Sequence, residues 1–317
     1  MTEGLAARRA RAVVCAYHNV GVRCLSVLLA GGVDVPLVLT HRDNPAEAIW
    51  FSSVAELAGR HGIRVITPDD PNAAEVIAEV AASAPDFLFS FYYRSMLAPA
   101  LLAVAPRGAL NMHGSLLPRY RGRVPVNWAV IRGERETGAS LHYMTARPDQ
   151  GDVVGRQRVP ILPDDTAFEV FQKVTWAAEV LLEASLPALL AGTAPREPQD
   201  LGAGNYCGGR RPEDGRIDWR RPLAEVHNLV RGVAPPYPGA FTTLGGLPAR
   251  VLRTQHAPPS APPRGSSVPL LLASPTSGLY VVHPDGSTLR ILELELDGRP
   301  ADAADVLARL GTETALA

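Results

Sequence analysis

The sequence has 317 residues, of which 46% are hydrophobic and 20% are charged, so it can bury a core and is not composed like a disordered chain. Its formal net charge of -1 lacks the excess of positive charge with which proteins hold nucleic acids. The composition favours a globular protein with small-molecule partners and argues against nucleic-acid binding.

Cysteine usage and hydropathy limit the cellular location. Cys15, Cys24 and Cys207 are an odd number without C-x-x-C spacing, which predicts neither a disulfide framework nor a metal site and is typical of a reducing compartment. Basic residues near the N-terminus precede only a short apolar run at 12–16, and no apolar stretch approaches the ~20 residues of a membrane helix. We therefore expect a cytoplasmic protein without a metal and without membrane insertion.

The first part of the sequence has the pattern of an α/β fold. From about residue 11 to residue 190, short apolar runs alternate with longer amphipathic segments, which predicts βαβ units and a Rossmann-like, mostly parallel sheet. The expected strands are 12–17, 33–40, 63–67, 87–91, 108–112 and 139–144, and the expected helices include 53–61 and 72–82. A long helix should run from Asp165 and Thr166, which can cap free amide groups, to about residue 190.

The second part of the sequence is shorter and has a different pattern. Residues 191–211 are rich in glycine, proline and polar residues, which predicts a linker. A short helix at 223–231 and strands at 240–254 and 279–294 should follow, with a proline- and serine-rich stretch at 257–267 between the strands. We expect a catalytic Rossmann-like domain at 1–200 and a small, mainly β domain at 201–317.

The turn after the first strand lacks the signature of a dinucleotide-binding fold. Such a fold places G-x-G-x-x-G there, so that backbone amides can approach a pyrophosphate. Residues 17–21 instead read Y-H-N-V-G. This argues against an NAD-dependent enzyme, although ligands are still expected beyond the carboxyl ends of the strands.

Polar residues replace apolar ones where the strand 108–112 ends. Because strand side chains alternate between faces, Asn111 and His113 should project to the same side, at an exposed strand end. An amide donor and a titratable base then converge. An isolated N-x-H is more often structural, since both side chains can satisfy backbone groups at a strand end, so the pattern alone leaves both interpretations open.

A second polar run, R-P-D-Q-G-D at 147–152, follows the strand 139–144. By itself such a run is an ordinary turn. Because it would end a neighbouring strand, we expect it to face the same crevice as His113. Asp149 could then orient the imidazole, as paired acid and base groups require.

Together these runs resemble the signature of the 10-formyltetrahydrofolate-dependent formyltransferases. The strings are N-M-H-G-S-L-L-P-R-Y-R-G-R-V-P at 111–125 and A-R-P-D-Q-G-D at 146–152, and similar strings lie at 17–19, 40–45, 89–94 and 235–241. The likeness covers nearly the whole chain. It is greatest to the formyltransferase domain of the bifunctional polymyxin-resistance enzymes of lipid A modification, which formylates UDP-4-amino-4-deoxy-L-arabinose. The sequence has no room for their second half, so we expect a stand-alone transferase.

The resemblance implies a formyltransferase fold with an OB-like second domain, and a catalytic trio of Asn111, His113 and Asp149. Asn111 would donate to a developing oxyanion, His113 would move protons, and Asp149 would hold the imidazole. Which of His113 and Asp149 takes the proton of the amine stays open. The co-substrate 10-formyltetrahydrofolate would lie against Ser95, Met96, Leu97, Arg123, Thr145, Ala146, Arg147, Pro148 and Asp149.

The sugar nucleotide has weaker candidate contacts, which are Tyr92, Tyr93, Arg119 and Arg121. Aromatic residues at a strand end are more often part of the core or its rim, and loop arginines are more often solvated. Pro148 replaces the alanine or similar residue common in the family and would stiffen its loop. The sequence leaves the acceptor sugar, its stereochemistry and the oligomeric state open.

Several other functions compete with formyl transfer to a sugar nucleotide. Methionyl-tRNA formyltransferases carry a basic, glycine-rich insertion, whereas residues 42–50 contain one basic and two acidic residues. A hydrolase of the same folate and a glycinamide ribonucleotide transformylase keep a similar trio, but the whole-length likeness argues against both. A non-catalytic protein that binds a nucleotide sugar or folate would be expected to lack one of the three residues. The sequence therefore predicts transfer of a formyl group to a nucleotide-linked amino sugar.

Overall fold

The computed structural model describes residues 9–45, 47, 49–259 and 266–316. The chain forms two compact units whose segments alternate along the sequence. Unit 1 comprises Met1–Pro125, Thr137–Val159 and Gln172–Cys207. Unit 2 comprises Val126–Glu136, Pro160–Phe171 and Gly208–Ala317. The domain boundary expected at residue 200 stays a prediction.

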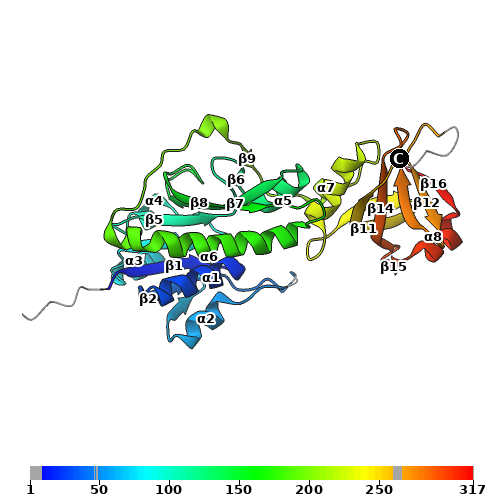
Figure 1. Ribbon diagram of the computed structural model, residues 1–317. Helices are drawn as coiled ribbons and strands as arrows, with labels where there is room; N and C mark the ends of the chain where they lie inside the picture. Colours follow the sequence, from blue (N-terminus) through cyan, green and yellow to red (C-terminus); the bar gives the residue numbers. More distant parts are fainter. Residues whose placement is uncertain (1–8, 46, 48, 260–265, 317) are drawn as a thin grey trace, which may run out of the picture. The chain divides into compact units, whose positions relative to one another are not determined.

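Unit 1 is built on a seven-stranded sheet in the order β3-β2-β1-β4-β5-β7-β8 (Figure 1). The pairs among the first five strands are parallel, which confirms the Rossmann-like, mostly parallel sheet. The strands are β1 (Arg11–Ala16), β2 (Asp34–Leu39), β3 (Arg64–Ile66), β4 (Phe87–Phe91), β5 (Ala109–His113), β7 (Glu136–Tyr143) and β8 (Val153–Pro160). Strands β1 and β4, near the middle of this order, are almost entirely buried and apolar, as parallel strands covered on both faces require.

One edge of this sheet differs from the expectation. Strand β7 runs antiparallel to β5, with Leu110 opposite Tyr143 and His113 opposite Ser140. The carboxyl end of β7 therefore lies beside the amino end of β5, so the premise that two successive strand ends share one crevice was wrong. Strand β8 was not expected at all, because its sequence V-V-G-R-Q-R-V-P lacks a continuous apolar run.

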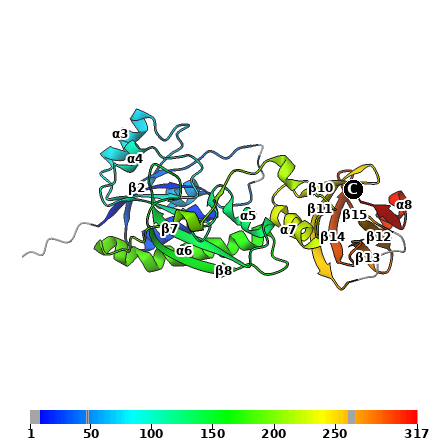
Figure 2. The ribbon, with the colours of Figure 1, turned by 90° about the horizontal axis from the view of Figure 1, so that it is seen from above.

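Helices α1 (His18–Ala30), α2 (Val54–Arg60), α3 (Ala74–Ala82) and α4 (Pro99–Leu102) connect the parallel strands. Figure 1 labels α1 and α2, and Figure 2 shows α3 and α4 from above. Helix α1 buries the stripe that contains Val20, Cys24 and Leu28, spaced by four residues as an amphipathic helix requires. Gly21 lies on this stripe, where a Cβ atom would be 3.1 Å from the Cβ of Ala16. The glycine lets α1 lie close to the end of β1.

Helix α6 (Ala167–Ala191) confirms the expected long helix, and Thr166 accepts from the amide of Glu169 at its start. By length and composition alone α6 could cross a membrane, since its 25 residues include a window of mean hydropathy 1.4, so the expectation that no stretch is long enough was wrong. Buried core helices pass the same test. Leu181 lies against Gly155 of β8 and Leu186 against Gly31 after α1, which are packing contacts of a core helix.

Unit 2 is smaller and mainly β, as expected. An antiparallel sheet in the order β10-β11-β14-β13-β12-β16, with β15 paired to β14, surrounds a core that includes Trp219 and Val251. The expected strands 240–254 and 279–294 are each split by a turn, because Gly245 and Gly246 both have positive φ and Gly286 closes the other hairpin. Residues 260–265 of the proline- and serine-rich stretch lie outside the described residues.

The elements of unit 2 include a helix, α5 (Pro125–Ile131), whose first residue belongs to unit 1, and the expected helix, which is α7 (Leu223–Val233). The others are the 3-10 turn η2 (Pro212–Gly215), β10 (Ala240–Leu244), β11 (Leu247–Ala257), β12 (Leu270–Ser274), β13 (Gly278–Val282), β14 (Thr288–Leu296), β15 (Arg299–Ala301), α8 (Ala303–Leu310) and β16 (Glu313–Ala315).

The pairing of β7 with β8 depends on Gly138. A Cβ atom there would lie 2.0 Å from the carbonyl oxygen of Gln157. We expect Gly138→Ala to lower the free energy of unfolding by about 2 kcal/mol, since backbone must move to relieve the overlap. Gly59→Ala in α2 is the control, because its Cβ would meet nothing within 4 Å. Equal stability of the two variants in urea unfolding would contradict the role given to Gly138.

Candidate active site

The site is built on the last residues of β5. Along β5, Asn111 is half-buried and the other residues are buried, with Met112 on the opposite face. The residue His113 is only 6% exposed, so the expectation of an exposed strand-end histidine was wrong. Asn111 and His113 do share one face of the strand, as the alternation of side chains predicted.

Both nitrogens of the His113 ring face an acceptor. Nε2 lies 2.8 Å from the carbonyl oxygen of Tyr120. A carbonyl oxygen only accepts hydrogen bonds, so Nε2 carries the proton and donates it. Nδ1 lies 3.5 Å from Oδ1 of Asp149. In the neutral ring Nδ1 is therefore the nitrogen that is open to a proton, and it faces a carboxylate.

Asp149 reaches this position through a returning loop rather than by ending a strand beside His113. The loop from β7 to β8 closes tightly at Gly151, where a Cβ atom would lie 1.9 Å from the carbonyl oxygen of Tyr143. Asp149 itself has a φ of 56°, in the left-handed region that Asp tolerates better than most residues. The structure thus brings Asp149 to His113 by strained backbone.

The Asp149 carboxylate is almost enclosed, with its side chain 10% exposed. Oδ2 accepts a hydrogen bond of 2.8 Å from the amide of Gly122, and Oδ1 lies 3.5 Å from both His113 Nδ1 and His142 Nε2. Burial by itself raises the pKa of this carboxyl. The charge of His113 in its protonated form, the hydrogen bond and charge that His142 offers when it is protonated, and the Gly122 amide outweigh it and hold the pKa of Asp149 well below the ordinary range.

His142 is the site residue that the sequence analysis missed. It stands opposite Asn111 in the β5–β7 register and is 2% exposed. Its Nδ1 donates to the carbonyl oxygen of Tyr143 at 2.8 Å, which makes Nε2 the acceptor of the neutral ring, and Asn111 Nδ2 lies 3.1 Å from that atom. A histidine at the next-to-last position of the strand that borders β5 was the available signal.

Gly122 is required by the close approach of two chain segments. The strand β6 (Arg121–Gly122) pairs in parallel with β9 (Tyr206–Cys207). Gly122 has a φ of 98°, and a Cβ atom there would lie 2.2 Å from the carbonyl oxygen of Cys207. This conformation, which favours glycine, turns the amide of Gly122 toward Asp149. The short β9 lies inside the segment that the sequence suggested was only a linker.

The residues expected to contact folate fall into two loops. After β4, Leu97 is buried, Ser95 is half-buried and the Met96 side chain is 58% exposed. Asn72 holds this loop, since its Nδ2 donates to the carbonyl oxygen of Met96 and its Oδ1 accepts from the amide of Ala98. In the second loop and beside it, the exposed or half-buried residues are Thr145, Ala146, Arg147, Pro148 and Arg123.

The four residues proposed for the sugar nucleotide separate into two groups. Tyr92 is half-buried, and its hydroxyl lies where a Cβ of Gly114 would be 2.0 Å away, beside His113. Arg119 is exposed. Tyr93 is a core residue, 9% exposed and stacked on His41. Arg121 is also 9% exposed, and its guanidinium donates to the carbonyl oxygens of residues 201 and 205, which argues against a solvent-facing phosphate contact.

Aromatic rings fill the turn after β1. The Tyr17 hydroxyl donates to Asp43 Oδ1 at 2.7 Å, and the His18 ring stacks on Phe51 with centroids 4.0 Å apart. Burial lowers the pKa of His18 to about 3, and the charge of Arg94 adds to this effect. At neutral pH the ring is therefore uncharged. This turn has no open glycine loop for a pyrophosphate.

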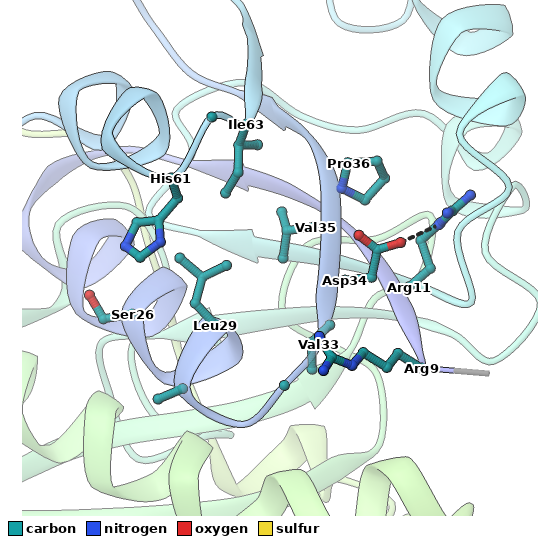
Figure 3. Close-up of a pocket in the computed structure, with 13 residues that line it drawn as sticks. Arg9, Arg11, Ser26, Leu29, Val33, Asp34, Val35, Pro36, His61 and Ile63 are labelled. Carbon is teal, nitrogen blue, oxygen red and sulfur yellow. Dashed lines mark hydrogen bonds and ion pairs between the residues drawn. The ribbon is translucent and has the colours of Figure 1, made fainter. Parts of the chain in front are cut away.

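A cavity of about 790 Å³ lies at the amino ends of β1 and β2, and the residues at the end of β5 do not line it (Figure 3). Its lining includes Asp34, which begins β2, and Arg11, which begins β1 and forms a 2.7 Å ion pair with Asp34. The cavity contains none of the expected site residues. Among the described residues, no group of three or more His, Cys, Asp or Glu side chains could hold a metal ion.

The fold is a Rossmann-like sheet without a dinucleotide loop. An amide, two imidazoles and a carboxylate meet at the end of β5, and together these features define a group-transfer enzyme of the α/β class. Residues 19–185 match the formyl transferase family, and residues 210–311 match the formyl transferase C-terminal domain. The chain belongs to the formyl transferase family and is a formyltransferase.

Solved structures share this fold at low sequence identity. The N-formyltransferase from Helicobacter canadensis, in complex with folinic acid and dTDP-3-aminofucose, is 17% identical, with 89% of this chain and 98% of that chain covered and a TM-score of 0.67. WlaRD, a sugar 3N-formyl transferase solved with dTDP and 5-N-formyl-THF, is 16% identical, with 90% and 98% covered and a TM-score of 0.69. A 4-N formyltransferase from Francisella tularensis is 18% identical, with 73% and 91% covered and a TM-score of 0.60.

The depressed pKa of Asp149 makes stability depend on pH. An ionised Asp149 stabilises the fold fully above the unfolded pKa of about 3.9, and this contribution is lost as the pH falls through the lower folded pKa. We expect the wild-type protein to be more stable than Asp149→Asn at pH 6, with a difference that shrinks below about pH 4.

Urea unfolding of both proteins between about pH 3 and 7 measures this difference. The control is Asp69→Asn, which removes an exposed carboxylate outside the site. A stability difference between wild type and Asp149→Asn that stays constant with pH would show that Asp149 is not the stabilising anion described above.

Proposed function

We propose that the enzyme transfers the formyl group of 10-formyltetrahydrofolate to the amine of a nucleotide-linked amino sugar, with UDP-4-amino-4-deoxy-L-arabinose as the acceptor. The convergence of Asn111, His113 and Asp149 in a formyl transferase domain is the observation that carries this proposal. The sugar N-formyltransferases of the same fold, two of them solved with folate derivatives and a dTDP ligand, support the class of donor and acceptor.

The chemistry of formyl transfer requires these side chains. When an amine attacks a formyl carbon, negative charge develops on the formyl oxygen and the attacking nitrogen becomes acidic. Asn111 Nδ2 has two hydrogens, of which His142 Nε2 can accept only one, so the other can be donated to the oxyanion. A preorganised donor of this kind typically contributes about 3 kcal/mol to the transition state.

His142 and His113 have different roles in this mechanism. With Nδ1 bonded to a carbonyl oxygen, His142 can present a lone pair at Nε2 and so fix the orientation of the Asn111 amide. His113 keeps Nδ1 open on the side of Asp149. His113 can therefore accept a proton from the incoming amine and return it to the departing folate nitrogen.

The two loops after β4 and β7 suit a folate. A pterin is flat, with polar edges, and binds where an apolar surface lies beside free backbone groups. Met96 offers an exposed apolar side chain on a loop that Asn72 fixes, and the 145–148 loop is open to solvent. Ser95, Leu97, Arg123 and Thr145 to Asp149 complete the proposed contacts.

The sugar nucleotide is proposed to lie on the opposite side of the reacting amine. Tyr92, whose hydroxyl lies beside Gly114, is proposed to contact the sugar. Arg119 is exposed and can bind the pyrophosphate, since two phosphates need only one or two arginines. Because Arg121 is committed to backbone carbonyls, we no longer assign it to the substrate.

The two alternative functions are less well supported. A methionyl-tRNA formyltransferase needs positive charge for a polyanion, but Asp43 and Glu47 are committed to Tyr17 and Arg94 in the stretch where a basic insertion would stand. A non-catalytic binding protein has no need for a buried carboxylate paired with an imidazole. The free, buried cysteines fit a cytoplasmic location, and a role in lipid A modification follows only if the acceptor is the proposed one.

His113→Ala tests the mechanism. We expect turnover to fall by at least about a hundredfold, the low end of what an acid–base group contributes. Because His113 is buried, the variant should also lose about 1–2 kcal/mol of stability, so turnover must be measured under conditions where it remains folded. His61→Ala, at an exposed position outside the site, is the control. If folded His113→Ala keeps more than about a tenth of wild-type turnover, His113 does not transfer the proton.

The acceptor is tested by direct comparison. The enzyme is given 10-formyltetrahydrofolate with UDP-4-amino-4-deoxy-L-arabinose, with dTDP-linked 3- and 4-amino sugars or with methionyl-tRNA, and mass spectrometry detects the added formyl group. We expect the UDP-linked sugar to be formylated and the tRNA to remain unmodified at physiological salt. Formylation of the tRNA with none of the sugars would overturn the acceptor class. Preference for a dTDP-linked sugar would overturn only the nucleotide.

A further inference from the structure

Residues 197–207, which we call the strap, contact both the loop that carries Asp149 and the loop whose Tyr120 carbonyl accepts from His113. At one end, the backbone of Glu197 exchanges two hydrogen bonds with Val153 at the start of β8. At the other end, β9 pairs with β6. Gly204 passes so close to Pro118 that a Cβ atom would lie 2.1 Å from its carbonyl oxygen. The strap is therefore held to the rest of unit 1 at both ends and at Gly204, and is not a free linker.

Gln199 connects the strap to the Asp149 loop. Its Nε2 donates to the carbonyl oxygen of Asp149 at 3.0 Å and to that of Gly151 at 2.6 Å. Its Oε1 is buried and has no hydrogen-bond partner in the part of the chain that the structure describes. The side-chain amide thus uses both of its N–H hydrogens, one for each of the two carbonyl oxygens that the turn brings together. This pair of bonds supports the left-handed conformation of Asp149.

Asn205 connects the strap to the other loop. Its Oδ1 accepts from the amide of Tyr120 at 2.6 Å, and its own carbonyl oxygen accepts from the amide of Arg121. The carbonyl oxygen of the same Tyr120 receives Nε2 of His113. Tyr120 has a φ of 57°, so this loop too is held in a conformation that the residue does not favour by itself. The strap thus holds the acceptor that orients His113.

We propose that Gln199 is a positioning residue for Asp149 and that the strap, with Asn205 at its other contact, sets the separation between Asp149 and His113. The role in turnover rests on the function proposed above. The role in holding Asp149 does not, because it follows from the contacts in the free protein.

Loss of the Gln199 amide leaves two carbonyls without their donor in a half-buried loop. The loop can then relax from its left-handed turn, a conformation that is unfavourable for a residue with a Cβ atom. The groups that face the Asp149 carboxylate are His113 from β5, His142 from β7 and the amide of Gly122 from β6. Relaxation moves the carboxylate away from all three at once, so the pKa of Asp149 rises toward its ordinary value.

Two substitutions of similar volume test the proposal. Gln199→Met keeps the size of the side chain but donates no hydrogen bond. Gln199→Glu keeps the shape, and its carboxyl can donate only when protonated. The matched control is Gln157→Met, since Gln157 is also half-buried in unit 1 and its amide donates to a backbone carbonyl, that of Arg158, outside the site.

The first measurement is the titration of the Asp149 carboxyl carbon by NMR in the protein without substrates. We expect its pKa to rise by about one unit or more in Gln199→Met and to stay unchanged in Gln157→Met. An unchanged titration of Asp149 in folded Gln199→Met would overturn the proposal. If that variant does not fold, the titration in Gln199→Ala, which also donates no hydrogen bond, decides, with the same outcomes.

The second measurement is turnover. We expect kcat of Gln199→Met to fall by about ten- to a hundredfold, with KM for both substrates changed by less than about threefold, because misplacement affects the transition state more than binding. The kcat ratio of Gln199→Glu to Gln199→Met should rise as the pH falls, when the carboxyl becomes a donor. If KM rises by as large a factor as kcat falls, or if the kcat ratio of Gln199→Glu to Gln199→Met does not change with pH, Gln199 has only a general structural role. If the wild-type enzyme formylates no sugar nucleotide, the proposed function fails and the NMR titration still decides the role of Gln199.

Discussion

The ionised carboxylate of Asp149 in an almost enclosed position is the constraint on which the rest of the site depends. Removing a carboxylate from water without compensation costs several kcal/mol, and burial alone would keep the group protonated. The imidazoles of His113 and His142 and the amide of Gly122 reverse that preference. Each comes from a different strand, so β5, β7 and β6 must meet at one point. The geometry of the backbone around the site follows from that requirement.

The sheet topology explains why the loops are strained. In a dinucleotide-binding fold the turn after β1 is an open glycine loop, but here Tyr17 and His18 fill it with rings. The polar side chains instead meet at the end of β5. Since β7 is antiparallel, its chain must return across the sheet edge before Asp149 reaches His113, which accounts for the left-handed Asp149 and the tight contact at Gly151. Such a loop needs support from outside, and Gln199 provides it.

The sequence predicted those parts of the structure that depend on local pattern. The parallel strands, α6 and the small β unit followed from hydrophobic periodicity, and Asn111 and His113 followed from the alternation of side chains on β5. Direction of pairing has no local signal, so β7 was placed wrongly and His142 was overlooked. The strap was read as a linker because its glycine, proline and polar residues resemble a solvated segment, whereas here they permit close approach and hydrogen bonding. Whether Arg121 faces solvent or backbone likewise depends on contacts distant in sequence.

The arrangement also indicates which group takes the proton of the amine in the proposed reaction. Because the pKa of Asp149 is held well below its ordinary range, its carboxylate is a weak base and a poor acceptor for the proton of the amine. His113 has Nε2 committed to Tyr120, so a proton can arrive only at Nδ1, on the side of Asp149. The imidazolium formed there gains from the fixed negative charge, and that gain falls with distance between the two groups. In the proposed reaction Asp149 would therefore act by its charge and position and His113 by proton transfer, and the backbone that fixes their separation would be part of the catalytic apparatus.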